Sequence, residues 1–296
     1  MTAPGAMPPL WAVVAAYDVE CGVGAVLGAV VSRVGAGLVW VVVDTASTAA
    51  AVTAVVRRFA AVTAVAAVAA VVRRFAADAP FTVRLVREEE RGAGAAVGTG
   101  FGYAVAQDAG LLVRTDADCR PAADWIAAAC RGFVHGTKTV LHGTKTVSRR
   151  TKTVSRRTKT VCGRGLPRRG GPPSLAKRCL LPAAVRATAL CGCCRAVYRL
   201  PRLRAPYVLC HGHSPALTAA LYVRCGGTLR VSLEGAPEGV VLLDRARGRS
   251  DRIVRAERMA VDASLRRLRA WGARRTLSWW WDSRCLPSDF DEVHVR

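Results

Sequence analysis

Residues 111–121 read LLVRTDADCRP, an apolar run followed directly by two aspartates that are one residue apart. The run is typical of a buried strand, and side chains along a strand alternate between its faces, so we expect Asp116 and Asp118 to point to the same side. Two converging carboxylates repel each other unless a cation lies beside them, and a divalent cation with oxygen ligands is the usual partner. A solvated Asp-x-Asp turn is the alternative, because so short a motif often occurs by chance. The stretch therefore predicts a candidate metal site at a strand end.

Apolar strands alternate with helices on both sides of this stretch. We expect strands at 11–16, 38–43, 81–86 and 111–115, and helices at 25–34, 49–77, 93–107 and 122–132. This alternation predicts an α/β fold with a mostly parallel sheet flanked by helices and joined by right-handed crossovers. Ligands of such sheets bind at the carboxyl ends of the strands, where Asp18, Asp44, Asp116 and Asp118 fall.

Composition limits the classes of protein that this chain can be. It has 296 residues, 51% of them hydrophobic, which is enough to bury a large core. The formal charge of +23 is compatible with nucleic acid or an anionic membrane surface as a partner. No window reaches the roughly 18 apolar residues of a membrane span, and the N-terminus is a poor signal peptide, so a cytoplasmic location is the default expectation. The 11 cysteines are then expected to be reduced.

Two segments of biased composition follow the first half of the chain. HGTKTV and TKTVSRR each occur twice at a lag of seven residues, and we expect 134–165 to be a basic, repetitive loop without stable structure. Beyond it we expect helices at 180–199 and 215–225 and a strand at 207–210. The segment 263–296 contains a cationic helix, 264–281, that carries four tryptophans. Such a helix suits either the membrane interface or a packed position with solvated arginines.

The order of six motifs resembles that of the family 2 glycosyltransferases. In the first half of the chain, AAYDVE at 15–20 is similar to the family's Pro-x-Tyr-Asn-Glu-Glu, DTASTA at 44–49 to its Asp-Asp-Gly-Ser-Thr-Asp, and DAD at 116–118 to its Asp-x-Asp. In the second half, GHSPA at 212–216 is similar to Gly-His-Asn-x-Ala, GGT at 226–228 to Gly-Gly-Phe, and EGVVL at 238–242 to Glu-Asp before an apolar helix. The resemblance implies a Rossmann-like sheet that binds a nucleotide-diphospho-sugar. It implies a nucleotide-sugar-binding half at 10–133 and an acceptor-side half at 166–262.

The resemblance also implies roles for individual residues. Asp118 would hold a divalent metal, Mn²⁺ or Mg²⁺, and Asp116 the metal or the ribose of the donor. The nucleoside would be held by Tyr17, Asp44 and Glu20. His213 would complete the metal shell, the alternative being a hydrogen-bonded turn histidine. Glu238 or Glu234 would have to serve as the general base, because Gly239 stands where the family has its aspartate.

Several functions are therefore compatible with the sequence. The leading hypothesis is an enzyme, an inverting glycosyltransferase of the hexosyltransferase type that moves a sugar from a nucleotide-diphosphate donor to a hydroxyl acceptor. The departures Val19, Thr45 and Gly239 favour the alternative of a catalytically impaired relative that binds nucleotide-sugars or polyanions. A peripheral position at the inner face of the membrane is a further possibility. A nucleic-acid module is disfavoured, because the basic loop has no interleaved aromatic residues.

Overall fold

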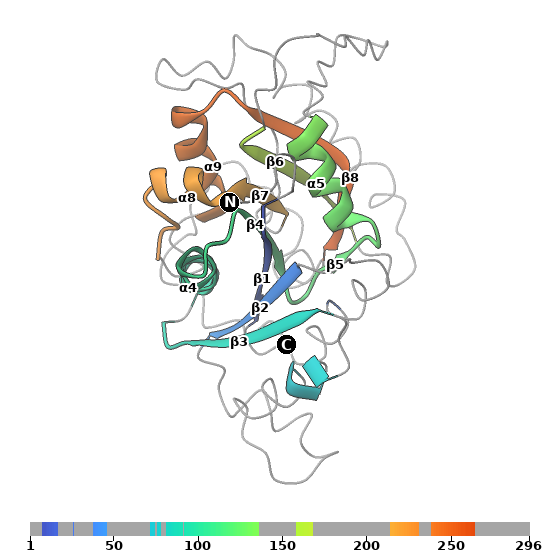
Figure 1. Cartoon of the computed structure of the whole chain (residues 1–296), viewed down its shortest axis with the longest axis vertical. Coiled ribbons are helices and arrows are strands. Elements are labelled where there is room, and N and C mark those ends of the chain that lie inside the picture. Colours follow the sequence, from blue (N-terminus) through green and yellow to red (C-terminus); the bar gives the residue numbers. More distant parts are fainter. Residues whose placement is uncertain are drawn as a thin grey trace, which may run out of the picture.

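The strands build one eight-stranded sheet in the order β3-β2-β1-β4-β7-β6-β8-β5 (Figure 1), and buried β-branched runs form β1 and β2 near its centre. Its strands are β1 Leu10–Ala16, β2 Leu38–Thr45, β3 Thr82–Glu88, β4 Leu111–Asp116, β5 Arg120–Pro121, β6 Thr160–Pro167, β7 Pro215–Thr218 and β8 Ile253–Ala263. The helices are α4 Ala93–Ala106, α5 Trp125–His135, α8 Ala219–Arg224 and α9 Glu238–Arg249. The computed structural model describes residues 8–16, 26, 38–45, 72–74, 76–77, 81–90, 92–135, 158–167, 214–230 and 238–263. Among these residues there is no helix of the length and apolarity that crossing a membrane requires.

The half of the sheet formed by β3, β2, β1 and β4 is parallel, as the alternation of strands and helices predicts. β1 lies at its centre, and six of its seven residues are buried, because both faces of the strand are covered. The other half is mixed: β7 runs antiparallel to β4 and β6, and β5 runs antiparallel to β8, whereas β6 and β8 are parallel. The fold is therefore α/β as expected, with antiparallel strands confined to the second half.

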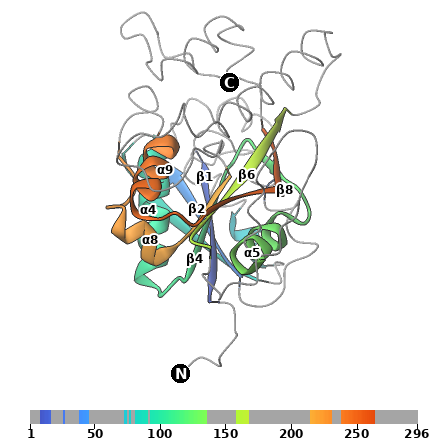
Figure 2. The same cartoon turned by 90° about the horizontal axis from the view of Figure 1, so that it is seen from above.

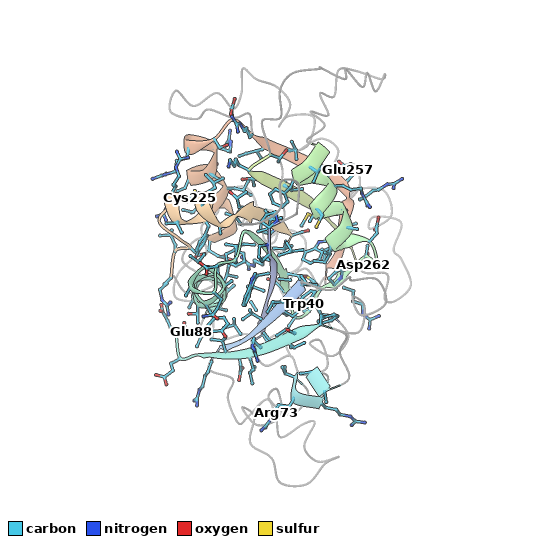
Figure 3. All side chains as sticks on the ribbon, in the orientation of Figure 1. Trp40, Arg73, Glu88, Cys225, Glu257 and Asp262 are labelled. Carbon is cyan, nitrogen blue, oxygen red and sulfur yellow. The ribbon has the colours of Figure 1, made fainter. Side chains whose placement is uncertain are left out.

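Helices cover the two faces of the sheet. α4, α8 and α9 lie on one face, and α5 lies on the other (Figure 2). α4 approaches β1 and β2 closely at Gly100, where an added Cβ would lie 2.5 Å from Val13 Cγ1 and 2.9 Å from Val43 Cγ2. Under α5, Trp40 of β2 stacks on Trp125 with ring centroids 6.5 Å apart (Figure 3).

The structure corrects the prediction for residues 215–225, where we expected one helix. Residues Pro215–Thr218 form β7, and α8 begins only at Ala219. Two physical features place this boundary. β7 is held between β4 and β6 by antiparallel pairing, and the Thr218 hydroxyl caps α8 by accepting from the backbone N–H of Leu221 at 3.3 Å.

The structure also corrects both ends of the expected loop at 134–165. α5 continues to His135, and β6 begins at Thr160. Residues 160–162 pair with β7 on one side and β8 on the other, so partners distant in sequence stabilise a segment that has little apolar pattern of its own. Residues 136–157 lie outside the described part of the chain. The helices expected at 25–34, 49–77, 180–199 and 264–281 and the strand expected at 207–210 fall wholly or mostly outside it as well.

Candidate functional site

Strand register brings two of the expected site residues to one edge of the sheet. In the ladder, Ala15 of β1 is opposite Asp116 of β4, and Ala16 is opposite Asp44 of β2. Asp44 and Asp116 thus flank the carboxyl end of β1, the edge at which parallel α/β sheets bind ligands. Asp44 is buried, whereas the Asp116 side chain keeps 30% of its surface exposed. Asp116 is therefore the more accessible of these two carboxylates.

A tight turn after β4 gathers three potential metal ligands. The backbone N–H of Cys119 donates to the carbonyl oxygen of Asp116 at 3.0 Å, which folds the chain back after the strand. As a result, one ligand atom each of Asp116, Asp118 and Cys119 lies within 4.8 Å of the others. Asp116 and Asp118 do converge, and a turn rather than strand alternation brings them together.

Burial distinguishes the thiol from the two carboxylates in this group. Cys119 is 2% exposed, and burial together with the negative charges of Asp116 and Asp118 raises the pKa of its thiol well above the usual range. A neutral thiol is a poor metal ligand, since the thiolate is the form that binds metals. Its Sγ instead donates to Asp118 Oδ1 at 3.4 Å. The donor set that remains, two carboxylates, fits a hard divalent cation such as Mg²⁺ or Mn²⁺.

A buried arginine that the sequence analysis did not single out completes the site. Arg114, 3% exposed, lies two residues before Asp116 and therefore on the same face of β4. Its Nε donates to Asp116 Oδ1 at 3.0 Å, and its Nη2 donates to Glu238 Oε1 at 2.9 Å. The guanidinium thus links the strand end to Glu238, the first residue of α9, across 124 positions of sequence. The available signal was a charged residue directly after the apolar run Leu111–Val113, at a position within the strand.

Charge and burial shift the pKa values of this network. Burial alone would lower the pKa of Arg114, but the neighbouring Asp116 and Glu238 carboxylates outweigh it and raise that pKa above its usual range. Burial raises the pKa of Asp116, Arg114 opposes this shift, and the negative charges of Asp118 and Glu238 add to it. Arg114 therefore stays charged, and its guanidinium is the positive partner of the carboxylates around it.

Segment 226–230 approaches the start of α4. A Cβ on Gly94, in the first turn of α4, would collide with the carbonyl oxygen of Leu229 and lie 3.4 Å from Glu238 Cβ. Glycine at this position is what lets the segment and the start of α9 approach α4. Leu229, which directly follows the GGT motif of the resemblance at 226–228, therefore packs on Gly94 together with Glu238.

An ion cluster fastens this segment to the end of β3. Arg230 donates from Nη2 to Glu88 Oε2 and from Nε to Glu90 Oε2, each at 2.7 Å. Glu88 also accepts from the Thr99 hydroxyl of α4, and it lies beside that helix (Figure 3). Burial raises the pKa of Glu88, but its hydrogen bonds to Thr99, the Glu90 N–H and Arg230 outweigh burial, and the net shift is downward. The cluster joins the end of β3, helix α4 and segment 226–230.

Four expected site residues cannot be placed. Tyr17, Glu20, His213 and Glu234 lie outside the described residues. Of the others, Asp116, Asp118 and Glu238 belong to one connected group, and Asp44 is at the same sheet edge on the far side of β1. Gly239 is buried in the first turn of α9.

Comparison with known proteins identifies the architecture. No protein-family model and no curated protein sequence matches the chain. The structure of mannosyltransferase PcManGT from Pyrobaculum calidifontis, solved in complex with GDP-Man and Mn²⁺, superposes with a TM-score of 0.53 and 19% sequence identity. This chain has a glycosyltransferase fold. The match covers 87% of this chain and 57% of the mannosyltransferase, so the chain spans little more than half of that protein's length.

A second similar structure is glucosyl-3-phosphoglycerate synthase from Mycobacterium tuberculosis, solved with Mn²⁺, UDP and phosphoglyceric acid. It is 16% identical, and the match covers 95% of this chain and 80% of that chain with a TM-score of 0.47. The glycosyltransferase fold of this chain rests on the mannosyltransferase match, and the expected fold class is confirmed.

Proposed function

We propose that this protein is a metal-dependent glycosyltransferase that moves a sugar from a nucleotide-diphosphate donor to a hydroxyl acceptor with inversion. The observation that carries the proposal is the grouping of Asp116 and Asp118 at the carboxyl edge of a glycosyltransferase-type sheet. The mannosyltransferase of this fold was solved with a nucleotide-sugar and Mn²⁺, which supports the same class of donor here.

In this proposal Asp118 and the exposed part of Asp116 hold the divalent cation. The cation, when bound, neutralises the charge that develops on the leaving diphosphate. Asp44, buried at the same edge, contributes to the nucleoside pocket together with Tyr17 and Glu20. His213 is a further candidate ligand. Arg114 donates to one oxygen of Asp116 and so fixes the orientation of this carboxylate at the donor end of the site.

The acceptor hydroxyl must lose a proton as the new bond forms, and an inverting mechanism needs a base on the face opposite the leaving group. Glu238 and Glu234 are the candidates. Glu238 already accepts a hydrogen bond from the buried Arg114, so one of its two oxygens is engaged within the protein. Glu234 is therefore the stronger candidate of the two.

The residues at positions 238 and 239 favour one alternative, a catalytically impaired relative that binds nucleotide-sugars without transferring the sugar. Gly239 supplies no carboxylate in the first turn of α9, and Glu238 is engaged by Arg114. Binding to an anionic membrane surface or another polyanion stays a separate prediction, because the cationic segment 264–281 on which it depends lies outside the described residues.

The test is the release of nucleoside diphosphate from a panel of UDP- and GDP-sugars in the presence of Mn²⁺. We expect wild type and the control D251N, which neutralises an exposed aspartate two residues before β8, to release product at similar rates. D118N should lower the rate at least a hundredfold, because it removes a charged metal ligand. Release that is indifferent to D118N and to chelator would refute the proposal. Donor binding without release in any form would establish the binding-module alternative.

A further inference from the structure

The guanidinium of Arg114 is shared between two carboxylates that belong to different parts of the fold. Asp116 is at the end of β4, and Glu238 is at the start of α9. Glu238 retains 13% of its side-chain surface and Arg114 only 3%, so neither offers much surface to a ligand from solvent. Asp116, with 30% exposed, is the member of the three that a metal ion can reach.

A fixed cation 3.0 Å from Asp116 opposes the binding of a second cation to the same carboxylate. Glu238 offsets that opposition, because it pairs with the other side of the guanidinium. With Arg114 charged, the group Asp116, Asp118, Arg114 and Glu238 has a net charge of about −2, whereas without the Glu238 charge it would have about −1. The number of charged groups at a site is one of the main determinants of its affinity for a divalent ion.

We propose that Glu238 and Arg114 form a positioning pair that sets the affinity of the Asp116–Asp118 site for its divalent metal, although neither residue is a metal ligand. This inference rests on the proposed function only in its assignment of Asp116 and Asp118 as metal ligands. It gives Glu238 a role different from that of a base, and it connects α9 to the metal site.

The geometry of the pair explains why an arginine is needed. Two different nitrogens, Nε and Nη2, reach the two carboxylates at the same time, and the planar guanidinium holds them at a fixed angle. A lysine would offer one nitrogen at the end of a flexible stem, so it would hold the two carboxylates less rigidly. The segment at Leu229 and the start of α9 pack over Gly94, which fixes Glu238 from the other side.

The experiment is a titration of the apo protein with Mn²⁺ alone, with free Mn²⁺ followed by electron paramagnetic resonance. E238Q keeps the shape of the side chain and removes its charge, and Arg114 still has Asp116 as a partner, so we expect this variant to fold. We predict that its affinity for Mn²⁺ falls by about three- to tenfold, since Arg114 then opposes the metal without compensation. The control D251N, which neutralises an exposed aspartate outside this group, should bind Mn²⁺ as wild type does.

The double variant R114M/E238Q makes the test decisive. It removes one positive and one negative charge, so the net charge of the group returns to that of wild type and the buried position 114 no longer carries a charge. We expect its Mn²⁺ affinity to return to within about twofold of wild type. Unchanged affinity in E238Q, or a double variant no better than E238Q, would overturn the inference, as would a wild type that takes up no Mn²⁺ at millimolar concentration.

The readout separates this inference from the proposed function. Mn²⁺ affinity is measured without nucleotide, sugar or turnover, so a protein that transfers no sugar can still show the coupling. Conversely, a base role for Glu238 predicts a loss of kcat in E238Q at saturating Mn²⁺ with no change in metal affinity, and that pattern also counts against the inference.

Discussion

Gly239 occupies the first turn of α9, next to Glu238, where the family that the sequence resembles carries an aspartate. G239D would place a carboxylate beside the acceptor side of the proposed site, and an acidic residue is favoured in the first turn of a helix. If the wild type lacks an effective base, we expect this variant to raise turnover of a nucleotide-sugar, because general-base catalysis contributes about 10²–10⁴-fold. Steady-state release of nucleoside diphosphate, measured beside donor affinity, checks this.

The matched control for G239D is G239N, which adds a side chain of the same size without a basic carboxylate. A gain in both variants would point to a packing effect. A wild type already as active as G239D would contradict the assignment of position 239 and would direct attention to Glu234.

At the level of single residues, the sequence was informative where chemistry alone defines a site. The convergence of Asp116 and Asp118 could be predicted from their spacing after an apolar run, and their role as metal ligands stays a prediction. Arg114 could not be assigned a role, because its partner Glu238 lies 124 residues away and only the fold brings the two together. The distance between Asp44 and Asp116 likewise depends on strand order, which places β1 between them.

α4 provides a test of packing within one element, since two of its glycines differ sharply in environment. A Cβ at Gly100 would lie 2.5 Å from Val13 Cγ1, whereas a Cβ at Gly102 would meet nothing within 4 Å. We expect G100A to lower the free energy of unfolding by about 1–3 kcal/mol, because the helix must shift away from β1. G102A should raise it by up to about 1 kcal/mol, because alanine favours the helix. Urea unfolding of both variants measures this, and equal effects of the two would show that α4 does not pack on β1 in this way.

The connection between β3 and segment 226–230 predicts a dependence of stability on pH. The hydrogen bonds of Glu88 hold its pKa in the folded protein below the ordinary value of 4.5. Its stabilising contribution is therefore present in full above about pH 4.5 and is lost as the pH falls through the folded-state pKa. We expect E88Q to be less stable than wild type by about 1 kcal/mol at pH 7, with the difference shrinking below pH 4.5.

Thermal unfolding of E88Q and of the control E89Q, a substitution at an exposed neighbour, tests this between pH 3 and pH 7. A difference between E88Q and wild type that stays constant over this range would mean that the charge of Glu88 is not what holds Arg230.

At the level of elements, the parallel half of the sheet could be predicted, because β1, β2 and β4 begin with apolar runs that are buried in the sheet. The second half could not. β6 contains Thr160 and Gly163, and it is a strand because β7 and β8 pair with it on both sides. Residues 215–225 look helical throughout, yet pairing with β4 makes their first part a strand, and no local signal in the sequence records that competition.

At the level of the whole molecule, fold and function rest on different grounds. The alternation of strands and helices predicts an α/β sheet, and the superposition on a mannosyltransferase at 19% identity confirms the type of fold. The charge of +23 did not help to predict the site, because the site itself is acidic around one buried arginine. What joins the fold to the proposed function is a single structural claim, that Asp116 and Asp118 hold a divalent cation and through it a nucleoside diphosphate.

Isothermal calorimetry of UDP and GDP binding, with Mn²⁺ and with excess chelator, tests that claim most directly. We predict that wild type and D251N bind one of these nucleotides in the presence of Mn²⁺. D118N should weaken that binding at least tenfold, about 1.4 kcal/mol, and chelator should weaken wild-type binding by a similar factor. Equal affinity of wild type and D118N, or binding that is indifferent to Mn²⁺, would contradict the account.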